Sequence, residues 1–175
     1  MKLNSETQKK IASEWFKYLQ LEMCKEFESL ERKAAKRKRI KPSIFKKKIW
    51  NKKDPRDGGG QYYLLKKGQI FDQVGINYSK VKGVFPKNFK SKIPGTKNSP
   101  SYWASGISIV AHMKNPKIPA LHFNTRFIVT SKSWFGGGMD ATPSYRDKKE
   151  KFFIHEKLRK LCKSNRKNYS IYKKW

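Results

Sequence analysis

Cysteine, acidic residues and long apolar runs are all scarce in this 175-residue sequence. Its only two cysteines, Cys24 and Cys162, lie far apart and form no CxxC pair, which argues against a disulfide framework and a cysteine-rich metal site. No apolar run approaches the ~20 residues that cross a bilayer, and the first residues have no signal-peptide core. Free thiols and the lack of a spanning segment together predict a soluble, cytoplasmic protein.

Only 13 residues are acidic against 42 Lys and Arg, so the chain carries a formal net charge of +29. Such an excess calls for an anionic partner, which could be nucleic acid, an anionic membrane surface or an acidic small molecule, or else for a compositional bias toward Lys, Asn and Ile. The most basic run, residues 33–53, lacks the regular aromatic spacing of a single-strand binding groove. We interpret it as a solvated helix end and a linker, and nucleic acid is the least favoured partner.

Despite the charge, 37% of the residues are hydrophobic and 14% are aromatic, enough for a folded core. We expect a single domain over residues 1–175. A capping box at residues 5–8 predicts the start of a helix, because apolar residues recur after it every three or four positions. The predicted core-facing stripe comprises Ile11, Trp15, Leu19, Met23, Phe27 and Leu30.

The middle of the chain has the alternation and the turn residues of an antiparallel meander. Short strands are predicted over residues 62–65, 69–74, 76–84, 106–113 and 119–130, with a loop over residues 85–100. A second helix is expected from residue 148 to residue 163, and residues 169–175 begin another. One stripe of the second helix carries Phe152, His155, Leu158 and Cys162.

Lysine is absent from residues 99–113 and 120–131, although a solvated sheet face in so Lys-rich a chain should contain some. Each of these segments alternates apolar and polar side chains, and the connection between them is short enough to return the chain antiparallel. If their apolar faces share the core, their polar faces coincide as well. The polar patch predicted in this way comprises Ser108, His112, His122, Asn124 and Arg126.

A third segment, residues 133–140, is expected to end a strand in a glycine turn that delivers Asp140 beside this patch. A hydrated sheet face is the simplest interpretation of such a patch. The choice of residues favours a site, because Arg offers a planar fork for a carboxylate and His moves protons near neutral pH. A metal site lacks compact ligand spacing, and Ser108 is not in the GxSxG elbow of a hydrolase.

Long stretches of the sequence resemble the oxygen-dependent coproporphyrinogen III oxidases. The strongest similarity lies in residues 106–112, 115–116, 119–127 and 134–145. Further matches lie in residues 15–20, 58–60, 68–79 and 172–175, and at Cys24, His155 and Cys162. The resemblance covers nearly the whole chain.

The resemblance implies an α+β fold in which an antiparallel β-sheet is flanked by helices on both sides, a homodimer, and a place in haem biosynthesis. The implied reaction is the oxidative decarboxylation of two propionates of coproporphyrinogen III to vinyls, which yields protoporphyrinogen IX. Dioxygen is the oxidant, and carbon dioxide and hydrogen peroxide are released. No organic cofactor is expected, and a divalent metal is an open possibility.

Carried over by position, the resemblance implies roles for individual residues. The implied substrate-binding residues are Ser108, Asn124, Thr125 and Arg126. The implied catalytic residues are His122 as proton donor, Asp140 at the pyrrole nitrogens and Arg126. The implied metal ligands are His112, His122 and His155.

The family continues well beyond the position that matches Trp175, so we expect the C-terminal part of the fold to be missing. Such a truncated chain is expected to have weak or no activity alone. The alternative is an inactive or split-gene fragment that binds tetrapyrrole without turnover.

Overall fold

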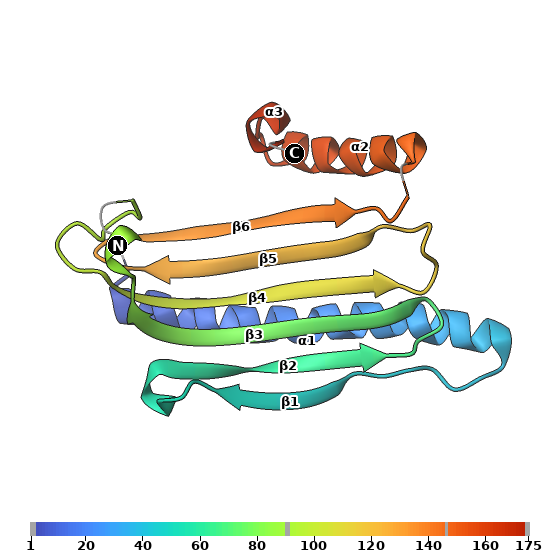
Figure 1. Ribbon diagram of the computed structural model, residues 1–175, viewed down its shortest axis with the longest axis horizontal. Helices are drawn as coiled ribbons and strands as arrows, with labels where there is room; N and C mark the ends of the chain where they lie inside the picture. Colours follow the sequence, from blue (N-terminus) through green and yellow to red (C-terminus); the bar gives the residue numbers. More distant parts are fainter. Residues whose placement is uncertain (1–2, 90–91, 146, 174–175) are drawn as a thin grey trace.

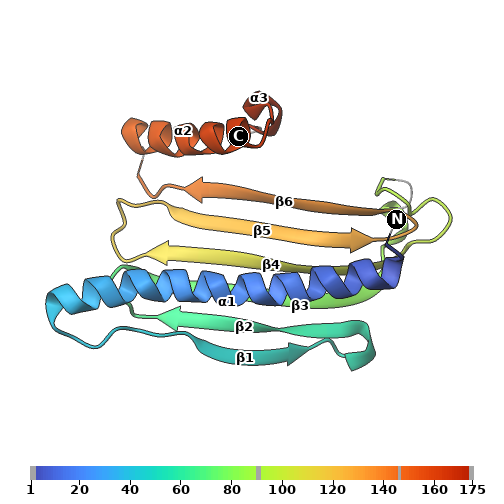
Figure 2. The ribbon, with the colours of Figure 1, turned by 180° about the vertical axis from the view of Figure 1, so that it is seen from behind.

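The computed structural model describes residues 3–89, 92–145 and 147–173 and shows one antiparallel sheet with a long helix across it (Figures 1 and 2). The six strands lie in the sheet in their order along the chain. The strands are β1 (Lys46–Asn51), β2 (Gly58–Lys66), β3 (Phe71–Val84), β4 (Ser101–Met113), β5 (Ala120–Val129) and β6 (Ser133–Thr142). The helices are α1 (Ser5–Lys38), α2 (Lys148–Ser164) and α3 (Tyr169–Tyr172), with short 3-10 turns at Pro55–Asp57 and Lys87–Phe89. The predicted α+β class and antiparallel meander are confirmed.

The helices divide the sheet into a covered face and an open face. Helix α1 lies across one face and packs on β3, β4 and β5 (Figure 2). Helices α2 and α3 lie beyond the β6 edge in both views. Within the described residues no helix covers the other face, where the resemblance had led us to expect a second layer. We call this second side of the sheet the open face.

The N-cap of helix α1 lies one residue before the predicted capping box. Its N-cap is Asn4, whose Oδ1 accepts a hydrogen bond from the backbone N–H of Thr7 at 2.8 Å. It ends at Arg39, which adopts a left-handed conformation with φ of 55°. No helix in the described part of the chain has the length and hydropathy needed to cross a membrane.

The predicted core stripe of α1 is partly wrong, because polar residues share the buried face. Three of its members, Ile11, Trp15 and Leu30, are about half exposed. The residues that are buried against the sheet are Ala12, Ser13, Phe16, Gln20, Cys24, Glu31 and Ala35. A stripe chosen by apolarity alone misses the three polar members, Ser13, Gln20 and Glu31, which are buried through hydrogen bonds.

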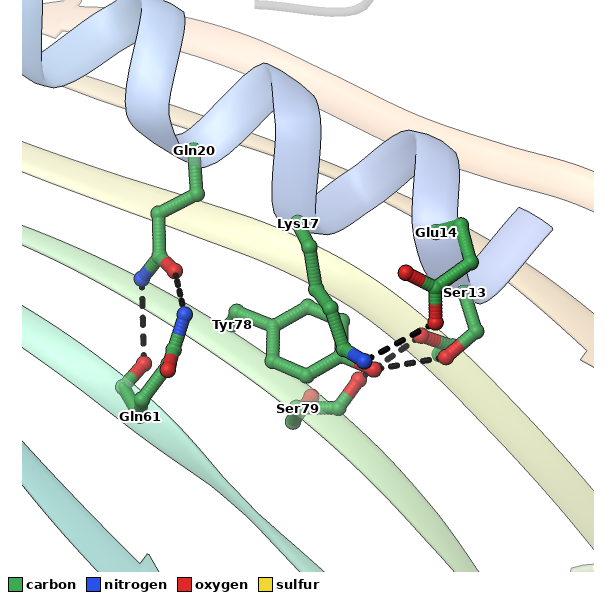
Figure 3. Close-up of polar contacts among 8 residues, drawn as sticks. Ser13, Glu14, Lys17, Gln20, Gln61, Tyr78 and Ser79 are labelled. Carbon is green, nitrogen blue, oxygen red and sulfur yellow. Dashed lines mark hydrogen bonds and ion pairs between the residues drawn. The ribbon is translucent and has the colours of Figure 1, made fainter. Parts of the chain in front are cut away.

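Two of these polar residues fix the helix to the strands beneath it (Figure 3). The Gln20 amide donates to the backbone carbonyls of Gln61 at 3.0 Å and Ile76 at 2.8 Å, and it accepts from the Gln61 amide at 2.9 Å. The hydroxyls of Ser13 and Tyr78 lie 2.6 Å apart. Because these partners lie on β2 and β3, they hold α1 at one position along the sheet.

The third buried polar residue, Glu31, joins α1 to the turn between β2 and β3. Its carboxylate is fully buried and accepts backbone N–H bonds from Gln69, Ile70 and Phe71 at 2.6, 2.9 and 2.9 Å. Gly68 lies against the same carboxylate, where a Cβ would overlap the oxygen. The turn is therefore built around this one side chain.

Several predicted strand boundaries are corrected by the structure. The basic run at residues 33–53 is not all helix end and linker, because it contains β1, an exposed edge strand that tolerates Lys. Residues 69–74 and 76–84 are not separate strands but belong largely to β3, with Gly75 inside it. Strands β2 and β4 begin earlier than predicted, at Gly58 and Ser101. The predicted helix at residues 169–175 extends over Tyr169–Tyr172, and its last two residues lie outside the described part.

The two thiols should differ sharply in reactivity. Burial raises the pKa of Cys24 to about 12, helped by the nearby Glu28, whereas Cys162 on α2 is only partly covered. At pH 8 a thiol reagent is expected to modify Cys162 and leave Cys24 unmodified, because the thiolate is the reactive form. Mass spectrometry should find one label on the folded chain and two in denaturant; rapid double labelling without denaturant would contradict the packing of α1.

Candidate functional site

The polar patch predicted from alternation lies on the open face. On β4 the side chains of Ile107, Ile109 and Ala111 are buried, and those between them are exposed. The register pairs Ser108 with Asn124, and Val110 with His122. The predicted coincidence of the two polar faces is therefore confirmed.

Asp140 lies directly across from His122 on the neighbouring strand. The predicted glycine turn is wrong, because Gly136–Gly138 continue β6 and pair with β5. Asp140 is paired with His122, and its Oδ1 lies 2.7 Å from His122 Nδ1. The Thr142 hydroxyl donates to the same Oδ1 at 3.2 Å. The two side chains remain accessible, with 37% of His122 and 59% of Asp140 exposed.

The Arg126 guanidinium lies two rows further along the same face, beyond Asn124. Its Nη2 donates to Asn124 Oδ1 at 2.7 Å, which orients the fork and leaves its other N–H groups for a ligand. Its neighbours across both adjacent strands are glycines, Gly106 and Gly136. A Cβ at Gly138, opposite Asn124, would meet no atom within 4 Å. The strands beside the Arg126–Asn124 pair thus carry Gly106, Gly136 and Gly138 and form a flat, uncovered surface, which we call the floor.

Thr125 is the predicted substrate residue that the fold separates from the others. It pairs with Ile107 and Gly137, so strand alternation turns its side chain toward the α1 side of the sheet. This geometry does not favour contact between the Thr125 side chain and a ligand on the open face. Its backbone still connects Asn124 to Arg126 and helps to set their spacing.

The three predicted metal ligands are not brought together. The His112 and His122 rings lie at right angles with their centroids 6.3 Å apart. His155 lies on α2 and hydrogen-bonds with the Tyr169 hydroxyl, where burial and the nearby charges of Lys173, Lys151 and Arg159 lower its pKa. No three His, Cys, Asp or Glu side chains within residues 3–89, 92–145 and 147–173 form a group that could hold a metal ion. The residues described therefore do not fit a metal, and we derive no step through one.

A shallow depression on the open face extends the site toward β3. It has a volume of about 360 Å³ and includes Ser79, Tyr102, Ser108 and Arg126 in its lining. Ser79 and Tyr102 were not identified from the sequence. Only the register of β3 and β4 places Ser79 beside Gly106, and Tyr102 lies in the part of β4 that precedes the strand predicted from residue 106.

Trp50 is a second residue that sequence reasoning missed. Its side chain points to the open face, and its indole lies over Gly60, where an added Cβ would be 3.0 Å from the ring. The indole Nε1 donates to Asn77 Oδ1 at 3.0 Å, and Asn77 is paired with Ser108. Trp50 thereby forms an aromatic border of the small-residue floor.

Comparisons with known proteins identify the family to which this chain is similar. The family model for coproporphyrinogen III oxidase matches residues 11–175. The chain is 47% identical over 154 residues to the oxygen-dependent coproporphyrinogen-III oxidase of Rickettsia felis, a match that covers 88% of this chain and 54% of the relative. The corresponding proteins of Rickettsia rickettsii and Rickettsia typhi are 46% and 45% identical, over 88% and 91% of this chain and 54% and 56% of their own lengths.

The chain therefore spans about half the length of the curated relatives it matches. The family match extends over all six strands and the helices that follow them, and includes the face that carries Arg126, His122 and Asp140. This chain belongs to the coproporphyrinogen III oxidase family.

Proposed function

We propose that this chain takes part in the oxygen-dependent oxidative decarboxylation of coproporphyrinogen III to protoporphyrinogen IX, a step of haem biosynthesis. The observation that carries the proposal is the His122–Asp140 contact beside the Arg126–Asn124 pair, on an open floor of glycines. We also propose a cytoplasmic location and assembly as a homodimer, both from the family. Dioxygen is the co-substrate.

Arg126 anchors the substrate through a propionate carboxylate. A guanidinium binds a carboxylate by two parallel N–H bonds, and the bond from Arg126 to Asn124 fixes the plane of the fork before the ligand arrives. Ser108, paired with Asn124, lies within the same floor and offers a hydroxyl. Because glycines flank Arg126, a pyrrole ring of the macrocycle can approach the strands closely.

Asp140 and His122 act at the pyrrole that reacts. A carboxylate beside a pyrrole N–H accepts or removes its proton, which makes the ring electron-rich and easier to oxidise. His122 is bound to that carboxylate through Nδ1 and has a second ring nitrogen free to exchange a proton with the reacting groups. The pair can therefore hold or move a proton next to a propionate that Arg126 has oriented.

The reaction balances for each propionate without an organic cofactor. The Cα–carboxylate bond breaks to release carbon dioxide, one C–H bond of the side chain is lost, and a vinyl group forms. The two electrons and the hydrogen pass to dioxygen, which takes one further proton and leaves as hydrogen peroxide. In this scheme the chain contributes binding, orientation and proton transfer.

The experiment is an aerobic incubation of the purified chain with coproporphyrinogen III. Products are oxidised to fluorescent porphyrins and separated by their number of carboxylates. We expect slow formation of a three-carboxylate intermediate, followed by a two-carboxylate product. The second candidate function is tetrapyrrole binding without turnover, which the solvent exposure of His122 and Asp140 favours. Binding without any product would select it and reject catalysis.

Removing the Arg126 guanidinium should weaken tetrapyrrole binding more than it slows the reaction. The loss of charge-assisted bonds worth about 1.5–3 kcal/mol predicts that Arg126→Ala binds coproporphyrin about tenfold to 100-fold more weakly. Arg126→Lys should recover only part of this, because Lys keeps the charge without the fork. Porphyrin fluorescence titration measures both. Arg56→Ala, which removes an exposed guanidinium paired with Asp54, is the matched control and should bind as the unmodified chain does.

A further inference from the structure

The open face has a second cationic end, four strands away from Arg126. Strand alternation places Lys46, Lys48 and Trp50 of β1 on this face, since Trp50 pairs with Gly60 and Lys48 with Tyr62. Lys46 and Lys48 are exposed, and the ion pairs found within the described residues do not include them. Their charges are therefore free to meet an anion from this side of the sheet.

One row of the open face between the two ends is made of small residues. A single row across the strands runs from Trp50 through Gly60, Ser79 and Gly106 to Arg126. No residue between the two ends of this row is larger than serine. At about 4.8 Å per strand, the backbone positions at its ends are about 19 Å apart. Lys48 and Lys46 lie one and two rows along β1 from Trp50, next to Tyr62 and Leu64. Their side chains are long enough to meet a ligand several strands wide that lies over this row and reaches Arg126.

Trp50 gives this floor a border at its β1 end. Its indole is held down on Gly60 and tied to Asn77 on β3, so it reaches from the edge strand toward the centre of the sheet. An aromatic face beside two lysines suits a ligand that is an aromatic ring system with a carboxylate at its rim. The two neighbours of Lys48 on its own strand, Lys47 and Ile49, alternate to the opposite side.

We propose that Lys46 and Lys48 form a second carboxylate subsite, which holds the propionate of the pyrrole opposite the one anchored at Arg126. The proposal rests on the proposed function. Each of the four pyrroles of coproporphyrinogen III carries one propionate, so opposite rings present carboxylates at opposite ends of the macrocycle. Because Asp140 and His122 lie at the Arg126 end, the propionate held on β1 is one that does not react while it is held there.

This subsite would make affinity depend on the number of carboxylates. A tetrapyrrole with four of them can engage both ends at once, whichever ring is placed at Arg126. One with two propionates on adjacent rings can engage only one end. The exposed position of the lysines limits the gain in affinity, since each solvent-exposed charge pair contributes modestly to binding and is screened by salt.

The test compares two double variants that remove the same charge. Lys46→Gln/Lys48→Gln empties the proposed subsite, and Lys47→Gln/Lys53→Gln removes two nearby lysines that do not lie in it. Affinities for coproporphyrin III, with four carboxylates, and mesoporphyrin IX, with two, are measured by fluorescence titration. We expect the first variant to lose about fivefold in coproporphyrin affinity and less than twofold for mesoporphyrin. The second should change neither by more than twofold.

Two results would overturn the subsite. Equal losses from both double variants, or equal losses for both porphyrins, would show only general attraction by a basic surface. Arg126→Ala, measured in parallel, separates this failure from that of the proposed function. If Arg126→Ala weakens binding while the Lys46/Lys48 pair is neutral, only the second subsite is wrong. If Arg126→Ala is also neutral, tetrapyrrole binding on the open face is wrong altogether.

Discussion

Glu31→Gln is expected to lower the free energy of unfolding by about 3 kcal/mol, a large effect for a change of one atom. The buried Glu31 carboxylate accepts three backbone N–H bonds at the turn between β2 and β3. A glutamine has one acceptor oxygen, and its amide hydrogens would face the N–H groups of that turn. At least one buried donor would then be left without a partner, in a position that water does not reach.

Urea unfolding followed by tryptophan fluorescence measures this change. Glu22→Gln is the matched control on the same helix, because Glu22 forms only an exposed ion pair with Lys25 and should contribute less than about 1 kcal/mol. If Glu31→Gln were as stable as Glu22→Gln, the turn would not depend on the carboxylate. The attachment of α1 to the sheet would then need another explanation.

Asp140→Asn is expected to lower kcat for coproporphyrinogen III by a factor of about 10² to 10⁴, the range typical of a lost general acid–base group. The substitution keeps the size of the side chain and can still hydrogen-bond with His122 Nδ1. It removes the negative charge that would take the pyrrole proton. The loss should appear mainly in kcat, whereas that of Arg126→Ala should appear mainly in substrate affinity.

The control for this prediction is Asp72→Asn, an exposed aspartate on β3 that lies outside the site. Steady-state kinetics over a range of substrate concentrations separate kcat from KM for each variant. An Asp140→Asn variant that kept a third or more of the unmodified kcat would remove Asp140 from the chemistry. The role of Asp140 would then be limited to orienting His122.

The open face could be predicted from the sequence because strand alternation is local. Once His122, Asn124 and Arg126 fall on one side of β5, the buried positions on the other side fix which way they point. The short connection to β4 then determines the partner strand, and Ser108 comes to lie beside Asn124. Predicting this part of the site therefore required no knowledge of contacts between distant parts of the chain.

Other features could not be predicted, because they depend on what the rest of the fold covers. Three consecutive glycines favour a turn, yet Gly136–Gly138 form strand, where β5 pairing supplies the hydrogen bonds that their own propensity does not. Strand β1 was not predicted because it is rich in lysine, a residue that is tolerated on an exposed edge strand. The polar residues that fix α1, such as Gln20 and Glu31, lie on the core side only because distant backbone groups satisfy them.

The central proposal is that the open face of this chain takes part in an oxygen-dependent decarboxylation. Its most direct test is the release of labelled carbon dioxide from coproporphyrinogen III labelled in the propionate carboxyls, measured in air and under argon. We predict release in air, none under argon, and a strongly reduced rate in Asp140→Asn. Release that is equally fast under argon, or none in air while the substrate is bound, would contradict the claim.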